Sequence, residues 1–465
     1  MIKTDLLSII IGPTIFFSLL ILTDIDFNSR VTIALIAWMV CYWLTNAIPL
    51  YATALLPLIV LPTAGVIPLT SVAVNYADRV IFLLLGSLIL AKAIEVSNLH
   101  RRFALRILML VGGEGKNILF GFIVVTALLS AFMSNTVVTA MMIPLAVSIL
   151  NVIDESRRRI LAPMLMLTIA YSANIGGIIT IVGTPPNLIL SSLAMEMGYN
   201  ITFLSWLPIG LPIGSTLLFI LWLYLSYKVK GIKVIEGKQV VRDELIRLGH
   251  ISKHERYVLG IFIITVVAWM SRGLWGSYIP SIDDSTIALV SAFMLFLLRV
   301  DGKRLLTWDD AAKIPWGVLI LIGGSLAIAG AFTTTGLDKV IASLISVEVG
   351  SDIYILALVT SITVFMTELM SNTAIATLMI PIVKGVALNV GMEPLSLIIA
   401  VTLSASLSFM LPVATPPNAM VFATGYLTVA YMARMGLIMN IFSIIVVTLL
   451  CYLLVGLIFN TILYI

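Results

Sequence analysis

Met133-Ser134-Asn135-Thr136 recurs as Met370-Ser371-Asn372-Thr373, and both copies lie in the middle of an apolar stretch. A second shared motif follows each copy. It reads Gly183-Thr184-Pro185-Pro186-Asn187 after the first and Ala414-Thr415-Pro416-Pro417-Asn418 after the second. Polar clusters at membrane depth are costly and by default indicate a functional site. An ordered pair of motifs that occurs twice is typical of a transporter built from two repeats.

The composition indicates a polytopic protein of the lipid bilayer. The chain is 60% hydrophobic and 11% charged, whereas soluble domains carry about a quarter of charged residues. The net charge of +4 therefore does not indicate a nucleic-acid partner. Both cysteines lie in apolar segments and the three histidines in polar ones, so no metal-ligand spacing and no nucleophile-base pattern is present. We expect a protein that is not an enzyme and has no organic cofactor.

Long apolar runs predict an all-α architecture. A helix needs about 20 residues to cross a hydrocarbon core of about 30 Å. Segment 1–29 carries the first span, not a removed signal, because no small-residue cleavage site precedes its charged loop. About eleven transmembrane helices are expected, near 5–23, 30–48, 52–69, 80–98, 162–198, 203–227, 257–275, 285–299, 315–333, 395–424 and 434–460.

Two other apolar segments, 117–153 and 353–387, are too long for one straight span and carry Ser-Asn-Thr near their middle. Broken backbone at membrane depth is tolerated only where it lines a cavity or is buried in protein. We therefore expect two re-entrant helical hairpins with the motifs at their tips. The paired prolines predict that 162–198 and 395–424 are broken helices, because a helix cannot continue through them.

The basic residues predict the orientation of the chain, because they gather in cytoplasmic loops. With a cytoplasmic N-terminus, a C-terminus outside and both hairpins returning to their own side, the cytoplasmic segments hold all 27 Lys and Arg residues except Lys92, Arg30, Arg79, Arg272, Lys339 and Lys384.

The same layout predicts two repeats of inverted topology. Five spans separate the two hairpins, and because five is odd, the hairpins enter from opposite sides. The first repeat covers 30–227 and the second covers 257–465, with 228–256 as a cytoplasmic connector that we interpret as a solvated or interfacial helix. In such inverted repeats the binding site lies at the interface of the repeats near the membrane centre.

Hydroxyl groups recur four positions before each motif serine, as Ser130 before Ser134 and Thr367 before Ser371. Four residues make one helical turn, so these oxygens are expected on one face at the end of a half-helix. Helix C-terminal carbonyls with side-chain oxygens suit Na+. A second half-helix begins after each motif, and its free N–H groups can hold an anion. Each tip thus offers both halves of a symporter site.

Basic residues are missing around both motifs: none occurs from 118 to 153, from 161 to 221 or from 353 to 383. A dianion at the membrane centre would then be neutralised by helix dipoles and bound cations, which predicts obligatory coupling. Glu368 is the one acid within a hairpin, and its counterpart in the first repeat is Ala131. Its role stays open between structural pairing with backbone or a hydroxyl and a part in cation or proton binding.

At these residues the chain resembles the divalent anion:sodium symporter family over nearly its whole length. The resemblance implies a carrier of C4-dicarboxylates (succinate, malate, fumarate) in the inner (plasma) membrane, coupled to Na+, in which a transport domain moves as an elevator past the scaffold of a homodimer. It implies one Na+ site from Ser130, Ser134, Asn135 and Gly183, and a second from Thr367, Met370 through its carbonyl, Asn372 and Ala414. The implied substrate contacts are Ser134, Asn135, Thr136, Thr184, Ser371, Asn372, Thr373, Thr415 and Pro416.

One stretch departs from the family. The chain reads Trp43-Leu44-Thr45-Asn46-Ala47-Ile48-Pro49 where the family often has an acid in place of Asn46. Because this stretch precedes the motifs, we expect an effect on packing or rate and not on substrate class.

The sequence leaves other anion carriers open. One is a Na+-independent dicarboxylate exchanger of the same fold, and another is a citrate or sulfate symporter, because hydroxyl and amide donors suit all of these anions. An anion channel would need a continuous polar pathway or rings of charge. The motifs form isolated clusters instead.

Overall fold

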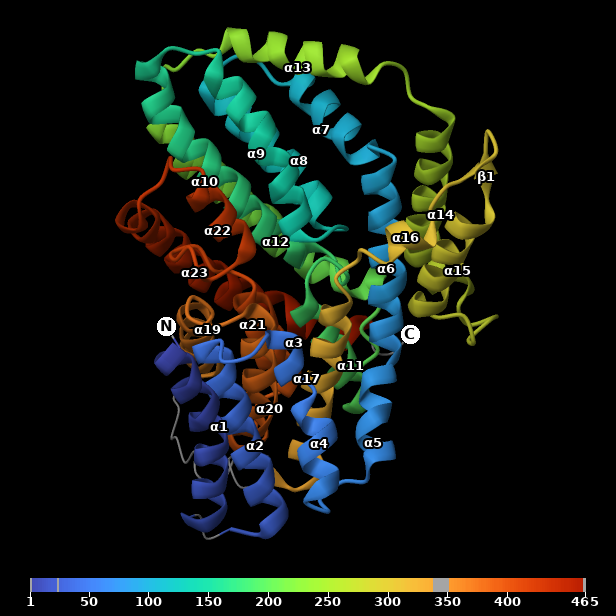
Figure 1. The fold of residues 1–465 in the computed structure, drawn as a ribbon, viewed down its shortest axis with the longest axis vertical. Helices are drawn as coiled ribbons and strands as arrows, with labels where there is room; N and C mark the ends of the chain where they lie inside the picture. Colours follow the sequence, from blue (N-terminus) through green and yellow to red (C-terminus); the bar gives the residue numbers. More distant parts are fainter. Residues whose placement is uncertain (1, 23–24, 338–350, 463–465) are drawn as a thin grey trace.

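The computed structural model describes residues 2–22, 25–337 and 351–462, and it is almost entirely helical (Figure 1). Within these residues the strands are β1 (Arg299–Val300) and β2 (Lys303–Arg304), which form a short antiparallel pair. The all-α prediction is confirmed. Lys339 and the last three residues of the chain lie outside the described residues.

Seven described helices are long and apolar enough to cross a bilayer, or eight if the pair Leu69–Val96 and Leu99–Leu110, bent by 68°, counts as one span. Other apolar helices are shorter, and several of them are half-helices that end or begin at a break in the chain. Outside the motif regions the structure has α1 (Ile2–Leu22), α2 (Phe27–Thr45), α6 (Arg79–Val96), α7 (Leu99–Leu110), α12 (Phe203–Lys228), α13 (Ile235–Leu248), α14 (Lys253–Trp275), α15 (Asp284–Leu297), α16 (Trp308–Ala311), α17 (Trp316–Thr334) and α23 (Val429–Ile462).

The prediction of one continuous span over 52–69 is wrong. The chain forms α3 (Leu50–Thr53) and α4 (Leu56–Thr63), then turns before α5 (Leu69–Val74) and the short 3-10 helix η1 (Asn75–Ala77). Gly65 in the turn has φ +72°, a left-handed conformation that glycine adopts at little cost. Proline, which cannot donate to a helical carbonyl, lies in the first turn of α4 and immediately before α5.

Each Ser-Asn-Thr motif lies between two half-helices. α8 (Gly115–Ser130) and α9 (Asn135–Asn151) flank the first motif and run side by side (Figure 1), and α19 (Asp352–Met366) and α20 (Asn372–Val390) flank the second. The chain between the members of each pair is non-helical. Each motif asparagine is therefore the first residue of a new helix.

Each Thr-Pro-Pro-Asn motif also follows a break. α10 (Glu155–Ile179) is followed by α11 (Pro185–Glu196), and α21 (Pro394–Ala405) is followed by α22 (Pro416–Ala423). The prolines occupy the first two helical positions of α11 and α22, where a missing N–H costs nothing. The second break, Ser406–Thr415, is longer than the first, Thr180–Thr184.

Three basic segments, 101–116, 154–159 and 228–256, meet at one end of the molecule, where α7 and α13 lie (Figure 1). Arg101 pairs with Glu244 of α13, and Arg157 pairs with Glu236. The buried Arg102 guanidinium is 2.6 Å from Glu255 on α14 and also donates to the carbonyls of Leu248, Gly249 and His250. These contacts put on one side three segments that the basic-residue distribution assigns to the cytoplasm.

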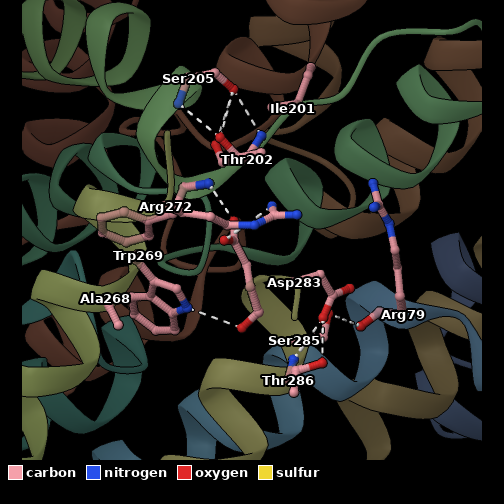
Figure 2. Close-up of polar contacts among 12 residues, drawn as sticks. Arg79, Ile201, Thr202, Ser205, Ala268, Trp269, Arg272, Asp283, Ser285 and Thr286 are labelled. Carbon is pink, nitrogen blue, oxygen red and sulfur yellow. Dashed lines mark hydrogen bonds and ion pairs between the residues drawn. The ribbon is translucent and has the colours of Figure 1, made fainter. Parts of the chain in front are cut away.

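A buried polar cluster joins the start of α12 to α14 and α15 (Figure 2). The Asp284 carboxylate accepts from the Phe203 backbone N–H at 2.7 Å and lies 3.5 Å from the Arg272 guanidinium. The Trp269 indole N–H donates to the Asp284 carbonyl at 3.0 Å. The start of α12 is thereby fixed to two helices that are far from it in sequence.

Candidate substrate and sodium site

Both pairs of motifs line one cavity of about 600 Å³. All predicted site residues except Ser130 and Thr367 contribute to its wall: Ser134, Asn135, Thr136, Gly183, Thr184, Met370, Ser371, Asn372, Thr373, Ala414, Thr415 and Pro416. Of the described residues that line it, none is charged. Segments that are more than two hundred residues apart thus form one uncharged pocket, in which the polar motif residues lie among apolar ones.

The motif serines cap the two half-helices that begin at the cavity. Ser134 and Ser371 have nearly the same backbone angles, with φ −57° and ψ 129° for the first and φ −58° and ψ 138° for the second. Neither serine side chain accepts a hydrogen bond from the helix it precedes. The N–H groups and the positive dipole ends of α9 and α20 are therefore available to an anion.

The buried hydroxyls of Ser130 and Thr367 lie behind the motif asparagines. Ser130 donates to Ala173 O at 2.9 Å and is 2.5 Å from Asn135 Oδ1. Thr367 makes the equivalent contacts, with Ala405 O at 2.6 Å and Asn372 Oδ1 at 3.0 Å. The expected pairing of these hydroxyls with the motif serines along one helix is wrong, because the preceding helices end at Ser130 and Met366.

Oxygen atoms also converge at the first tip. A Cβ atom at Gly177 would lie 3.0 Å from Asn135 Oδ1 and 3.3 Å from Gly183 O, and one at Gly183 would lie 2.5 Å from Gly177 O and 3.1 Å from Ala131 O. Glycine at both positions lets these neutral oxygens come together. Carbonyl and amide oxygens at the ends of broken helices are the donor set that binds Na+ in transporters, so the residues present fit the expected ion.

The last residue of each Thr-Pro-Pro-Asn motif closes the break behind it. Asn187 Nδ2 donates to Thr180 O at 2.8 Å and to Gly177 O at 3.4 Å. Asn418 does the same with Leu411 O at 3.1 Å and Ser408 O at 3.3 Å. Both asparagines thus reach carbonyls seven and ten positions upstream. Both residues belong to the repeated motif, but no role was predicted for them from the sequence. Their repetition is the signal that could have indicated a shared role.

Asn174 on α10 lines the cavity and contacts the second break. Its Nδ2 donates to Ser408 O at 2.9 Å, and the hydroxyls of Thr184 and Ser406 are 3.3 Å apart. Tyr171 OH, one turn earlier, donates to Phe409 O at 2.8 Å. The sequence reasoning missed Asn174, and no motif pointed to it.

The remaining wall comes from helices earlier in each half of the chain. It contains Trp43, Leu44, Asn46, Leu50, Tyr51, Leu84, Ser87, Leu88, Pro315, Val318 and Leu321. Asn46 caps the C-terminus of α2 with φ +50°. The sequence predicted an effect of Asn46 on packing or rate and not on substrate class, because it precedes the motifs. The structure places Asn46 at the cavity wall, so its position in the chain no longer argues against an effect on substrate.

The sequence over residues 4–463 matches the family model described as the sodium:sulfate symporter transmembrane region. The chain belongs to the divalent anion:sodium symporter family. The protein is therefore a transporter and not an enzyme. Na+ is the coupling ion of its family.

Relatives of this symporter include the sodium-dependent dicarboxylate transporter SdcS of Staphylococcus saprophyticus, which is 37% identical over 97% of this chain and 91% of the relative. The protein of the same name from Staphylococcus aureus strain USA300 is 35% identical over 96% of this chain and 91% of the relative. The structure is also similar to MtrF of Neisseria gonorrhoeae, whose description places it among antimetabolite efflux pumps. The TM-score is 0.56, with 14% identity over 82% of this chain and 83% of that protein, a likeness that shows the fold alone.

Proposed function

We propose that this symporter imports C4-dicarboxylates of the succinate, malate and fumarate class together with Na+. The observation that carries the proposal is the single uncharged cavity at which both Ser-Asn-Thr tips and both helix breaks meet. The names of the staphylococcal relatives, sodium-dependent dicarboxylate transporters, support the substrate class.

The two carboxylates of the substrate are assigned to the two tips. One meets Ser134, Asn135 and Thr136 at the start of α9, and the other meets Ser371, Asn372 and Thr373 at the start of α20. Thr184, Thr415 and Pro416 close the pocket between them. N–H groups at a helix start hold an anion without a fixed positive charge, which suits a cavity without Lys, Arg or His among its described lining residues.

Two Na+ ions are assigned to the oxygens behind these tips. The first site comprises Ser130, Ser134, Asn135 and Gly183, and the second comprises Thr367, the Met370 carbonyl, Asn372 and Ala414. Each asparagine belongs to both an ion site and a substrate site, and this sharing supplies the coupling: a bound cation orients the amide that the carboxylate contacts. A dianion that entered alone would be left without a counter-charge in a low-dielectric site.

The movement is proposed to be of the elevator type. We propose two inverted repeats, 30–227 and 257–465, joined by the connector 228–256, in a homodimer. The protein lies in the plasma membrane with its N-terminus in the cytoplasm and its C-terminus outside. The clustering of the basic segments 101–116, 154–159 and 228–256 at one end of the molecule (Figure 1) supports the proposed orientation, because basic residues gather in cytoplasmic loops.

The test is uptake of labelled succinate into proteoliposomes, with an inward Na+ gradient or with choline replacing Na+ on both sides. Accumulation only with Na+ is expected. Equal accumulation in choline would contradict Na+ symport. If internal dicarboxylate were then required, the exchanger would take its place. Stronger competition by citrate or sulfate than by malate would contradict the C4 assignment.

A further inference from the structure

Glu368 lies behind the second tip, is 3% exposed and contacts the break Ser406–Thr415. Its carboxylate accepts from three consecutive backbone N–H groups: Phe409 at 2.7 Å, Met410 at 2.9 and 3.0 Å, and Leu411 at 3.0 Å. Asn440 Nδ2 on α23 donates to it at 2.9 Å. All of these partners are donors, which is the set that an ionised carboxylate takes.

The two repeats differ at this point. In the first repeat Ser130 binds Ala173 O, and the chain after Ala173 remains helical to Ile179, so its N–H groups are satisfied within α10. In the second repeat Thr367 binds Ala405 O, and the helix ends there. In a longer helix the N–H groups of 409–411 would donate to helical carbonyls. Here they donate to the Glu368 carboxylate instead. Its counterpart Ala131 has no group that could do this.

The contacts lead from Glu368 to the assigned second ion site. Leu411, whose N–H is held by the carboxylate, accepts from the Ala414 N–H at 3.2 Å and from Asn418 Nδ2 at 3.1 Å. Thr367, the residue before Glu368, holds the other end of the break through Ala405. Two consecutive residues therefore fix both the start of the break and the part that carries Ala414.

We propose that Glu368 is a positioning residue that builds the second Na+ site: it holds the unwound segment in the conformation that presents Ala414, and its buried negative charge favours a cation beside Thr367. The first site has no such residue and depends on the longer α10. This inference rests on the proposed Na+ symport and adds to it that the two ion sites are held by different means.

The variant Glu368→Gln is a sharp test because it keeps the shape of the side chain. Its amide has one oxygen and one NH2 group, so at least one of the N–H groups of 409–411 would face a donor. Loss of this hydrogen bond loosens the segment that carries Ala414, so we expect the Na+ concentration for half-maximal uptake to rise by at least about tenfold. The Hill coefficient for Na+ should fall, while the substrate KM at saturating Na+ changes little.

A second readout is the thermal stabilisation of purified protein by Na+ without substrate, which we expect to weaken in the variant. Asp284→Asn is the matched control, because Asp284 is also a buried carboxylate that accepts a backbone N–H but lies in the α12–α14–α15 cluster. Its Na+ dependence should match the wild type. A merely structural role of Glu368 would reduce the yield of folded protein and leave the Na+ dependence of the folded fraction unchanged.

Asn440→Leu removes only the α23 donor and keeps the test valid if Glu368→Gln fails to fold. We expect a smaller shift of the Na+ dependence in this variant, and in the double variant no effect beyond that of Glu368→Gln. Wild-type Na+ dependence in folded Glu368→Gln, or in Asn440→Leu if that is the variant that folds, would overturn the proposal. If the wild type itself showed the same uptake and stability in Na+ and in choline, the proposed function would fail instead.

Discussion

Asn135 and Asn372 each face a buried hydroxyl on one side and the cavity on the other. We expect Asn135→Ala or Asn372→Ala to abolish transport without loss of folding, because each change removes an ion ligand and a substrate donor together. Labelled-succinate uptake by the purified variants measures this. Asn75→Ala is the control, since Asn75 bonds only to carbonyls of its own helical turn in the structure. Wild-type uptake by either motif variant would refute the shared role.

Asn187 and Asn418 make the same pair of hydrogen bonds across the two breaks. Replacement of either by alanine removes the two hydrogen bonds that its amide donates to buried carbonyls of the break. We expect each variant to lose about 1–3 kcal/mol of stability, seen as a lower unfolding temperature of the detergent-solubilised protein. Similar losses in the two variants are expected because the geometry is repeated. An unchanged unfolding temperature in both would show that the breaks do not depend on these amides.

At the scale of helices, α14 takes part in a buried ion pair, with Arg102 of α7, and in an exposed ion pair, with Asp301. Arg102 and Glu255 are each 4% exposed, whereas Lys253 and Asp301 are 65% and 69% exposed. Arg102→Met leaves the Glu255 carboxylate buried without its partner, and we expect it to destabilise the protein by about 3–5 kcal/mol. Lys253→Met, the matched control in the same turn of α14, should cost about 1 kcal/mol or less. Equal unfolding temperatures of the two variants would contradict this account.

The arrangement of helices also predicts opposite accessibility for two exposed positions. A cysteine at Asp154, which caps α10, should react with impermeant thiol reagents only from the cytoplasm, and one at Asn389, near the end of α20, only from outside. The background lacks Cys41 and Cys451, both of which are buried. Labelling of both positions from the same face of the membrane would rule out the inverted repeats.

For the whole molecule, the effect of membrane potential on the uptake rate reports how many Na+ ions accompany each substrate. The described residues that line the cavity are uncharged, so substrate and Na+ carry the charge there. A dicarboxylate dianion with two Na+ moves no net charge, so uptake should be indifferent to membrane potential. With more than two Na+ the cycle carries positive charge inward, and an inside-negative potential assists by about 2.3 kcal/mol per elementary charge per 100 mV. Uptake into proteoliposomes at imposed potassium-valinomycin potentials separates the two cases. Slower uptake at inside-negative potential would contradict both.

The sequence by itself determined the class of protein and indicated residues that lie together at one cavity. Apolar runs and sparse charge predicted an all-α membrane protein, and the repeated motifs predicted residues that line one cavity. The sequence carries this information because membrane depth restricts which residues occur there. Polar side chains at membrane depth are costly. The repetition of the Ser-Asn-Thr cluster therefore indicates a function even before the packing is known.

Only the tertiary structure decided which groups meet. Ser130 contacts Asn135 and not Ser134, Asn46 reaches the cavity, and the span expected over 52–69 is broken into short helices. Glu368, whose role the sequence left open, contacts three N–H groups some forty residues away. Such partners are set by how separate helices pack, and spacing along the chain reports only on neighbours within one element.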